Sequence, residues 1–141
     1  MRTSLGFVTF FTVALAIAAC GSGSSSSSSP SGPSPTSPTT PPADAVATTT
    51  ITIANGTASP KNIKVARGSQ VTFINNDSQP HNMTSDPHPE HTDCPEINSV
   101  GVLSVGQTRQ TSNMVTTRAV CGFHDHDAPN VAGLQGSITI Q

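Results

Sequence analysis

The sequence predicts an all-β sandwich in the C-terminal part of a chain of 141 residues. Three observations carry this prediction. Apolar and polar residues alternate in several short segments, turn-forming residues separate these segments, and no segment repeats apolar residues at helical spacing over ten residues. Short strands with frequent turns are typical of two β-sheets packed face to face.

The first 19 residues are typical of an export signal. Arg2 precedes an apolar stretch at residues 5–19, which is shorter than the roughly 20 residues that span a bilayer. The stretch ends in Ile-Ala-Ala-Cys at residues 17–20, which resembles the lipobox of bacterial lipoproteins. The resemblance implies a lipoprotein signal peptide at residues 1–19 and a lipid on Cys20, the first residue of the mature chain. An ordinary secretory signal that happens to contain a cysteine is the alternative.

Residues 20–43 are expected to form a disordered linker. After Cys20 this segment consists almost wholly of Ser, Pro, Gly and Thr and carries no charge. Such a composition cannot bury enough apolar surface to offset the chain entropy lost on folding. Gly and Ser at its start favour flexibility, whereas the prolines of residues 30–42 favour extended polyproline II. The sequence therefore predicts a folded domain at residues 44–141 that stands off from a membrane surface.

The strands of this domain follow from the alternation and from the turns between them. Residues 49–53 alternate with period two and precede the turn pair Asn-Gly, and the alternation returns on either side of the Arg-Gly turn at residues 67–68. Only Phe73 and Phe123 contribute aromatic rings, so a small aliphatic core is expected. The expected strands lie at residues 49–53, 63–65, 71–75, 102–105, 108–112, 117–121 and 136–140.

The charge distribution argues against a nucleic-acid partner. The formal net charge is −2, and the six Lys and Arg residues are scattered, so no basic stripe is available to neutralise phosphates. The histidines are not scattered. All five lie between His81 and His126, together with two of the three cysteines. This window is where metal or redox chemistry is expected.

Two groups of metal-ligand residues lie in this window. His81 and Met83 follow the strand at residues 71–75, and they point to one face if the extended geometry continues. Cys121 and His124 are separated by two residues, which is close enough to hold one ion from a short loop. One thiolate with two imidazoles is the ligand set that suits copper in a trigonal electron-transfer site.

Residues 44–141 resemble a cupredoxin, the blue-copper domain of plastocyanin and azurin. The resemblance is carried by Asn-Asn-Asp-x-x-Pro-His-Asn at residues 75–82, by Cys-x-x-His at residues 121–124, and by the closing Gly-Ser-Ile-Thr-Ile segment at residues 136–140. It implies a Greek-key β-sandwich that binds copper as Cu+ or Cu2+. It also implies three equatorial copper ligands and a residue behind them that ties the two ligand loops together by hydrogen bonds. The implied ligands are His81, Cys121 and His124, and the residue behind them is Asn82.

One departure from the family concerns the axial ligand. Leu134 stands where the family usually has an axial Met, and a Leu side chain has no lone pair to donate. A missing thioether favours Cu(I) and raises the reduction potential, unless Met83 takes the vacant position. Met83 is better explained as a core residue on the inner face of the sheet.

A second departure is the proline-broken loop at residues 85–95. His88, His91 and Cys94 follow one another at intervals of three residues in this loop. Together with His126 and Met83, they are candidates for a second metal site or for additional ligands of the first. A solvated loop in which these histidines have no specific role explains the pattern equally well.

The two remaining cysteines leave a choice open. With Cys20 lipidated, Cys94 and Cys121 form a pair in an oxidising compartment, where two thiols normally become a disulfide. That bond would remove the copper thiolate. We favour the thiolate, because Cys121 has His124 at the family spacing, and the disulfide is the alternative.

Three classes of function follow. The preferred one is a membrane-anchored electron carrier that moves one electron at a mononuclear copper lacking the axial Met. The alternative is a copper-binding or delivery module that uses His and Met ligands, with Cys94 and Cys121 joined as a disulfide. An enzyme ranks last. The His-x-His at residues 124–126 resembles that of copper oxidases and of copper-zinc superoxide dismutase, but the chain is too short for a multidomain oxidase and lacks the rest of the dismutase pattern.

The expected partners are a redox protein, or a copper donor or acceptor, in the cell envelope. The chain is expected to be a monomer that contacts the membrane through the lipid on Cys20 and binds no nucleic acid. The signal predicts an exported protein anchored to the cell envelope. In a double-membrane bacterium, the uncharged Gly21 resembles lipoproteins that are sent to the outer membrane, here on its periplasmic face.

Overall fold

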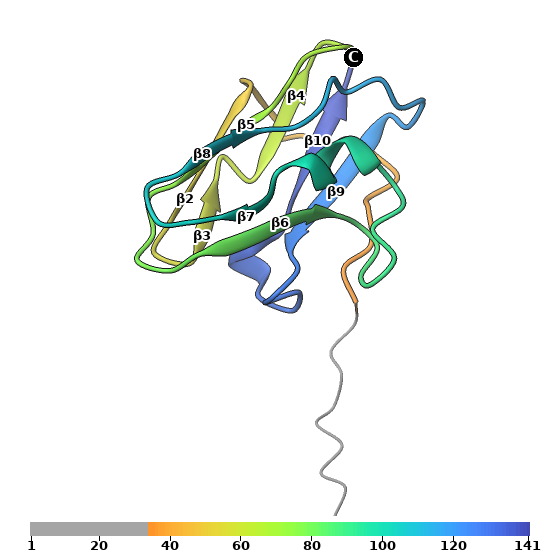
Figure 1. Cartoon of the computed structure of the whole chain (residues 1–141). Coiled ribbons are helices and arrows are strands. Elements are labelled where there is room, and N and C mark those ends of the chain that lie inside the picture. Colours follow the sequence, from red (N-terminus) through yellow and green to blue (C-terminus); the bar gives the residue numbers. More distant parts are fainter. Residues whose placement is uncertain (1–33) are drawn as a thin grey trace, which may run out of the picture.

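The structure is a computed structural model that describes residues 34–141. Two mixed β-sheets pack face to face, and the hydrophobic core lies between them (Figure 1). The first sheet has the strand order β1-β4-β10-β9-β6-β7, and the second has the order β3-β2-β5-β8. The expected all-β sandwich is therefore confirmed. The signal peptide, Cys20 and residues 21–33 lie outside the described residues.

Short strands and two short 3-10 helices make up the regular structure of residues 34–141. Within this part of the chain, no helix is long and apolar enough to cross a membrane. The elements are β1 (Val46–Ala47), β2 (Thr50–Ala54), β3 (Thr57–Ser59), β4 (Asn62–Val65), β5 (Thr72–Asn75), β6 (His81–Ser85), η1 (Pro95–Ser99), β7 (Gly101–Leu103), β8 (Thr108–Gln110), β9 (Val120–Asp125), η2 (Ala132–Leu134) and β10 (Gly136–Ile140).

The core is small and aliphatic, as the composition predicts. Ile51 and Ile53 on β2 alternate with half-buried threonines, so one face of the four-stranded sheet packs inward. Phe73 on β5 meets Phe123 on β9 edge to face, with ring centroids 5.4 Å apart. This aromatic pair joins the two sheets at the centre of the core.

Strand β9 is buried along its whole length, whereas the neighbouring strand β6 is buried only at alternate residues. It lies inside the six-stranded sheet, between β10 and β6. In its register with β6, Met83 pairs with Asp125, and Thr84 pairs with His124. Because paired residues share a face and successive residues alternate, His124 points to the outer face of this sheet, whereas Met83 points into the core.

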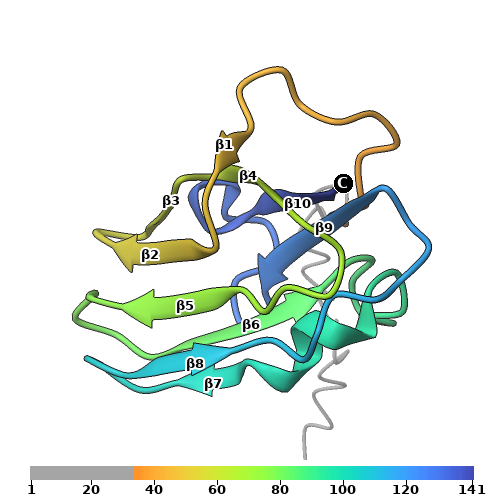
Figure 2. The same cartoon turned by 90° about the horizontal axis from the view of Figure 1, so that it is seen from above.

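Two irregular segments cover the outer face of β9. One is the loop at residues 86–94 that follows β6. The other is the N-terminal segment, drawn in orange, which runs along the side of the molecule where β9 and β10 lie (Figure 2). Pro35 and Ser37 of this segment are buried, although the composition of residues 20–43 predicts a disordered linker. The backbone amide of Gly122 donates a hydrogen bond to Ser37 Oγ at 2.8 Å.

Candidate metal centre

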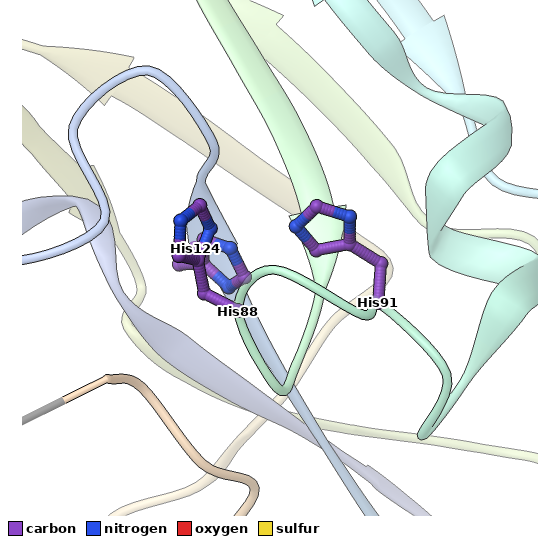
Figure 3. Close-up of side chains that lie close together, drawn as sticks. All are labelled: His88, His91 and His124. Atoms are coloured by element: carbon purple, nitrogen blue, oxygen red, sulfur yellow. The ribbon is translucent and has the colours of Figure 1, made fainter.

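Four imidazoles gather on the outer face of the six-stranded sheet, at the end of β9. His88 and His91 come from the loop at residues 86–94, whereas His124 and His126 come from β9 and the turn that follows it. One ring nitrogen from each of His88, His91 and His124 lies within 4.8 Å of the other two (Figure 3). The ring centroid of His126 lies 5.1 Å from that of His88 and 4.9 Å from that of His91. We call these four residues the imidazole cluster.

The backbone of the loop is bent so that His91 faces the cluster. His91 has a φ of 53°, in the left-handed region that few residues other than glycine adopt. Its amide donates to the carbonyl of Pro87 at 2.7 Å, and its carbonyl accepts from the side chain of Asn98 at 2.9 Å. A strained backbone held by such bonds is frequent at functional sites. The bend brings His91 Nε2 to 3.2 Å from His126 Nδ1.

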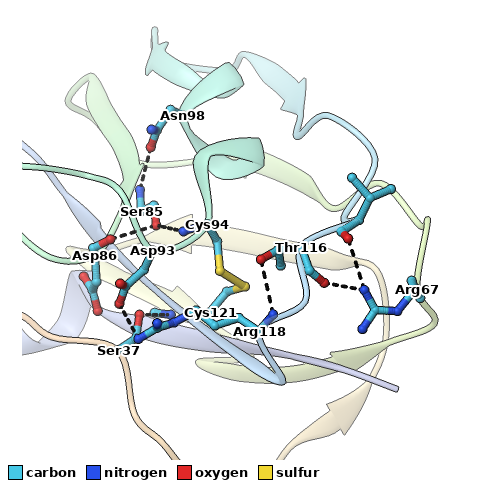
Figure 4. The surroundings of a disulfide bond; sticks show 12 residues. Ser37, Arg67, Ser85, Asp86, Asp93, Cys94, Asn98, Thr116, Arg118 and Cys121 are labelled. Atoms are coloured by element: carbon cyan, nitrogen blue, oxygen red, sulfur yellow. Dashed lines mark hydrogen bonds and ion pairs between the residues drawn. A yellow bond between two sulfur atoms is a disulfide. The ribbon is translucent and has the colours of Figure 1, made fainter.

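A disulfide between Cys94 and Cys121 fastens the end of the loop to β9 (Figure 4). Both cysteines are fully buried, and their Cα atoms lie 5.7 Å apart. Beside this bond, Arg118 forms an ion pair with Asp93 at 2.9 Å. The loop that carries two of the imidazoles is therefore joined covalently to the strand that carries the third.

Asp86 fixes the orientation of His124. Its Oδ1 lies 2.7 Å from His124 Nδ1, and both residues are buried. Because an ionised carboxylate only accepts hydrogen bonds, this contact places the imidazole proton on Nδ1 and the lone pair on Nε2, which lies 3.4 Å from the Thr84 hydroxyl and could bind a metal in its place. Gly122 makes room for Asp86, since a Cβ at Gly122 would lie 1.9 Å from Asp86 Oδ2.

The electrostatics of the cluster favour the neutral form of His91. Burial of the ring lowers the pKa of His91 below its usual value, and the neighbouring His124, His126 and His88 lower that pKa further. Neutral imidazole is the form that binds metal ions. His88 Nδ1 is buried and has no hydrogen-bond partner in the structure. A buried nitrogen without a partner, beside three other imidazoles, fits a bound cation.

The structure does not bring His81, Cys121 and His124 together, and in this it differs from the ligand set that the resemblance implies. The sulfur of Cys121 is bonded to Cys94, so it is not available as a thiolate. Strand β9 also continues through His124 instead of ending at Cys121. Residues three apart in a strand point to opposite faces, so His124 and Cys121 lie on different sides of the sheet.

His81 lies on the inner side of the sheet, away from the imidazole cluster. Its Nδ1 is 2.7 Å from Asp125 Oδ2, and its Nε2 is 3.3 Å from Asp77 Oδ2. Hydrogen bonds from the backbone amides of Gly56 and Ser78 are the main cause that lowers the pKa of Asp77. With both ring nitrogens engaged by carboxylates, His81 holds the loop after β5 against the end of β9.

The other expected ligands are distributed as follows. Met83 is fully buried in the core, as its explanation as a core residue predicts. Leu134 is also buried, and it lines a cleft of about 540 Å³ together with His81. Asn82 acts through its backbone. Its amide donates to Asp125 Oδ1 at 3.0 Å, and its carbonyl accepts from the amide of His126 at 2.8 Å. Asn82 therefore ties β6 to the segment that carries two imidazoles.

Sequence reasoning did not assign a role to two residues of the site, Asp86 and Ser37. Asp86 stands out in the sequence only as one of three acidic residues in the proline-broken loop. Its position directly after a strand and two residues before His88 is a signal that could have suggested a partner for an imidazole. Ser37 lies in a low-complexity segment that holds many serines, and no sequence signal distinguishes it from them.

Comparisons with known proteins show the family. Residues 47–141 match the family described as copper binding proteins, plastocyanin/azurin family. No curated protein sequence matches the chain. Among solved structures, a mutant plastocyanin of fern is 18% identical in sequence to this chain. Its TM-score is 0.51, and the match covers 65% of this chain and 99% of that chain. A mutant of amicyanin, solved in its oxidised state, is 16% identical in sequence to this chain. Its TM-score is 0.51, and the match covers 65% of this chain and 80% of that chain.

A purple cupredoxin from Nitrosopumilus maritimus is 21% identical with a TM-score of 0.49, covering 67% of this chain and the whole of that chain. At these identities, the likeness to the plastocyanin and amicyanin structures shows a shared fold. The match to the family covers nearly all of the residues that form the sandwich. The chain therefore belongs to the plastocyanin/azurin family of copper-binding proteins, and its cofactor is copper.

Proposed function

We propose that this protein is a copper-binding module whose copper is held by imidazoles and not by a thiolate. The ligands are His88, His91 and His124, with His126 as the fourth. One observation carries the proposal: Cys121 is consumed by the disulfide, whereas three imidazoles converge within 4.8 Å. Imidazole is a common copper ligand, and an arrangement of nitrogen donors suits Cu(II).

The surroundings of the cluster support binding of a metal ion. Asp86 holds His124 in one tautomer, and the disulfide holds the loop of His88 and His91 in place. Such supporting contacts orient ligands before the ion arrives and so lower the entropic cost of binding. The bound copper would supply a redox-active ion at the surface, because His88, His91 and His126 are only partly buried.

Copper titration of the mature protein tests this ligand set. We expect one Cu(II) per chain, an electron paramagnetic resonance spectrum of nitrogen ligation, and no intense visible band from a thiolate. His91→Ala and His124→Ala should each weaken binding at least tenfold, since each removes a donor. His81→Gln is the matched control, because it changes a buried imidazole on the other side of the sheet. An intense band that disappears in Cys121→Ser would refute the imidazole site.

A one-electron carrier is the second candidate, and membership in the plastocyanin/azurin family favours it. The two functions differ in what leaves the protein. A carrier exchanges an electron with a redox partner and keeps its copper, whereas a delivery module gives the ion to an acceptor protein. Reversible voltammetry, together with retention of copper during dialysis against a competing chelator, would support the carrier. Rapid loss of Cu(I) to the chelator after reduction would support delivery.

We propose further that the protein is exported and anchored to the cell envelope through a lipid on Cys20. The support is the Ile-Ala-Ala-Cys motif at residues 17–20 and the uncharged segment that follows it. Cys20→Ser should prevent acylation and leave an unprocessed precursor. The measurement is the intact mass of the membrane fraction. Maturation of the Cys20→Ser chain at the same bond, with retention in the membrane, would contradict the lipid anchor.

A further inference from the structure

We infer that Ser37 is a positioning residue of the copper centre, and that the strap, residues 34–38, forms part of that centre. Residues 20–43 precede the predicted domain, and their composition predicts no role in a folded site. The inference rests on the proposed function, because it concerns the imidazoles proposed above as copper ligands. It adds a part of the chain that none of the ligand patterns includes.

The strap is hydrogen-bonded to both segments that carry the ligands. The amide of Gly122 on β9 donates to Ser37 Oγ at 2.8 Å, two residues before His124. The amide of His88 in the loop donates to the carbonyl of Pro35 at 3.4 Å. The strap therefore bridges the loop and the strand at a second place, in addition to the disulfide.

The strap is seated by alternate residues, as an added strand would be. Pro35 and Ser37 are buried, whereas Ser34, Thr36 and Pro38 are exposed. One face of the strap therefore packs against the domain and the other faces solvent. A flexible tether that only touched the domain by chance would not bury alternate side chains.

Ser37 and Asp86 lie together over Gly122. A Cβ at Gly122 would lie 2.9 Å from the Cα of Ser37 and 1.9 Å from Asp86 Oδ2. Ser37 is drawn with Asp86 and Cys121 in the surroundings of the disulfide (Figure 4). The strap thus lies over the carboxylate that orients His124, and both residues of that pair are buried. Exclusion of water strengthens the hydrogen bond between a carboxylate and an imidazole.

Removal of the Ser37 hydroxyl should act on the metal through these two contacts. The buried amide of Gly122 loses its acceptor, which favours detachment of the strap. Water then reaches Asp86, and the ring of His124 is held less firmly in the orientation that the metal requires. Loss of a group behind a metal ligand typically weakens binding by about 10-fold to 100-fold. Because Ser37 acts on the ligand only through Asp86, we expect a loss at or just below the lower end of this range, roughly fivefold to tenfold.

The test compares Ser37→Ala with Thr36→Ala in the full mature chain. Thr36 is the matched control, because it lies next to Ser37 in the strap but is exposed. Three quantities are measured: Cu(II) affinity by competition with a chelator, the copper hyperfine coupling by electron paramagnetic resonance, and hydrogen exchange at the amide of Gly122. We expect Ser37→Ala to weaken copper binding, to change the hyperfine coupling and to accelerate exchange of this amide. Thr36→Ala should match the wild type in all three.

The outcomes separate this inference from the proposed function. If the wild type binds copper through imidazoles and Ser37→Ala has the same affinity and hyperfine coupling, the inference is overturned and the proposed function stands. A loss of apo-protein stability without a change in the hyperfine coupling would mean that Ser37 is merely structural, which also overturns it. A wild type that shows no imidazole-bound copper would overturn both. The exchange measurement reports on the strap even in the absence of copper.

Discussion

Replacement of both Cys94 and Cys121 by alanine should strongly destabilise the copper-free protein. The disulfide joins residues separated by 27 positions. In the chain-entropy model, a loop of this length restricts the unfolded chain enough to stabilise the folded state by roughly 3.5 kcal/mol at 25 °C. Small domains have a total free energy of unfolding of only about 5–15 kcal/mol. The double variant should therefore keep its fold but lose a large part of its stability.

Urea unfolding of the copper-free protein measures this effect. We expect a lower midpoint for the double variant, and a steeper dependence on urea because its unfolded chain is more expanded. The single variants are unsuitable because each leaves a free thiol. The wild type unfolded in the presence of a reductant provides the control, since it should approach the stability of the double variant. A double variant as stable as the wild type would refute the reasoning, as would two free thiols in the native exported protein.

The same variant tests the role of the disulfide at the metal centre. All four imidazoles remain in the double variant, but the loop of His88 and His91 is no longer joined to β9. The loop is then more mobile in the copper-free protein, and copper binding has to restrict this additional conformational freedom. We therefore expect weaker Cu(II) binding, with nitrogen ligation unchanged in the electron paramagnetic resonance spectrum. Loss of that nitrogen signature would contradict the expectation that the imidazoles hold copper without the disulfide.

Further predictions concern positions around the two faces of the sheet. Leu134→Met should leave the reduction potential of copper unchanged, because this residue lines a cleft away from the imidazole cluster; a lower potential would show that the new thioether reaches the ion. Gly122→Ala should lower the melting temperature and weaken copper binding, since the added Cβ collides with Asp86; a normal melting curve would contradict the placement of that carboxylate. The stability of the copper-free protein should fall as the pH decreases below about 6.5, because the lowered pKa of His91 means that the unfolded chain binds the proton more readily than the folded one. A second loss of stability should follow below about pH 4, because the lowered pKa of Asp77 means that the unfolded chain binds this proton more readily as well. Chemical unfolding across this pH range measures both losses.

The β-sandwich could be predicted because apolar and polar residues alternate with period two in its half-buried strands. Strands β2 and β5 lie within one residue of the segments expected from the sequence, and β10 coincides with residues 136–140. Strand β9 was expected to end at Cys121 but continues to Asp125. Its last residues are polar, and the local sequence carries no sign that a loop and the strap cover them. The ligand positions that depended on the end of this strand were therefore misplaced.

The choice between thiolate and disulfide could not be made from the sequence. It depends on how close Cys94 and Cys121 come in the folded chain, which is a tertiary property. The three-residue spacing of His88 and His91 can be read from the sequence. The directions of their side chains cannot, because a loop has no regular period from which to predict them. The same holds for the strap, since composition separates linkers from domains without showing which residues of a linker become buried.

The oxidation state of the two cysteines also decides which donors an incoming ion meets first. Before the disulfide forms, the thiols of Cys94 and Cys121 are free in addition to the four imidazoles of the cluster, and sulfur is the softer donor that selects Cu(I) or Zn. A soft metal ion bound by these thiolates at this stage would block formation of the bond. A metal that arrives after oxidation meets only nitrogen. Assembly of the imidazole centre therefore has an order, with the disulfide first and copper second, and this order requires an oxidising environment.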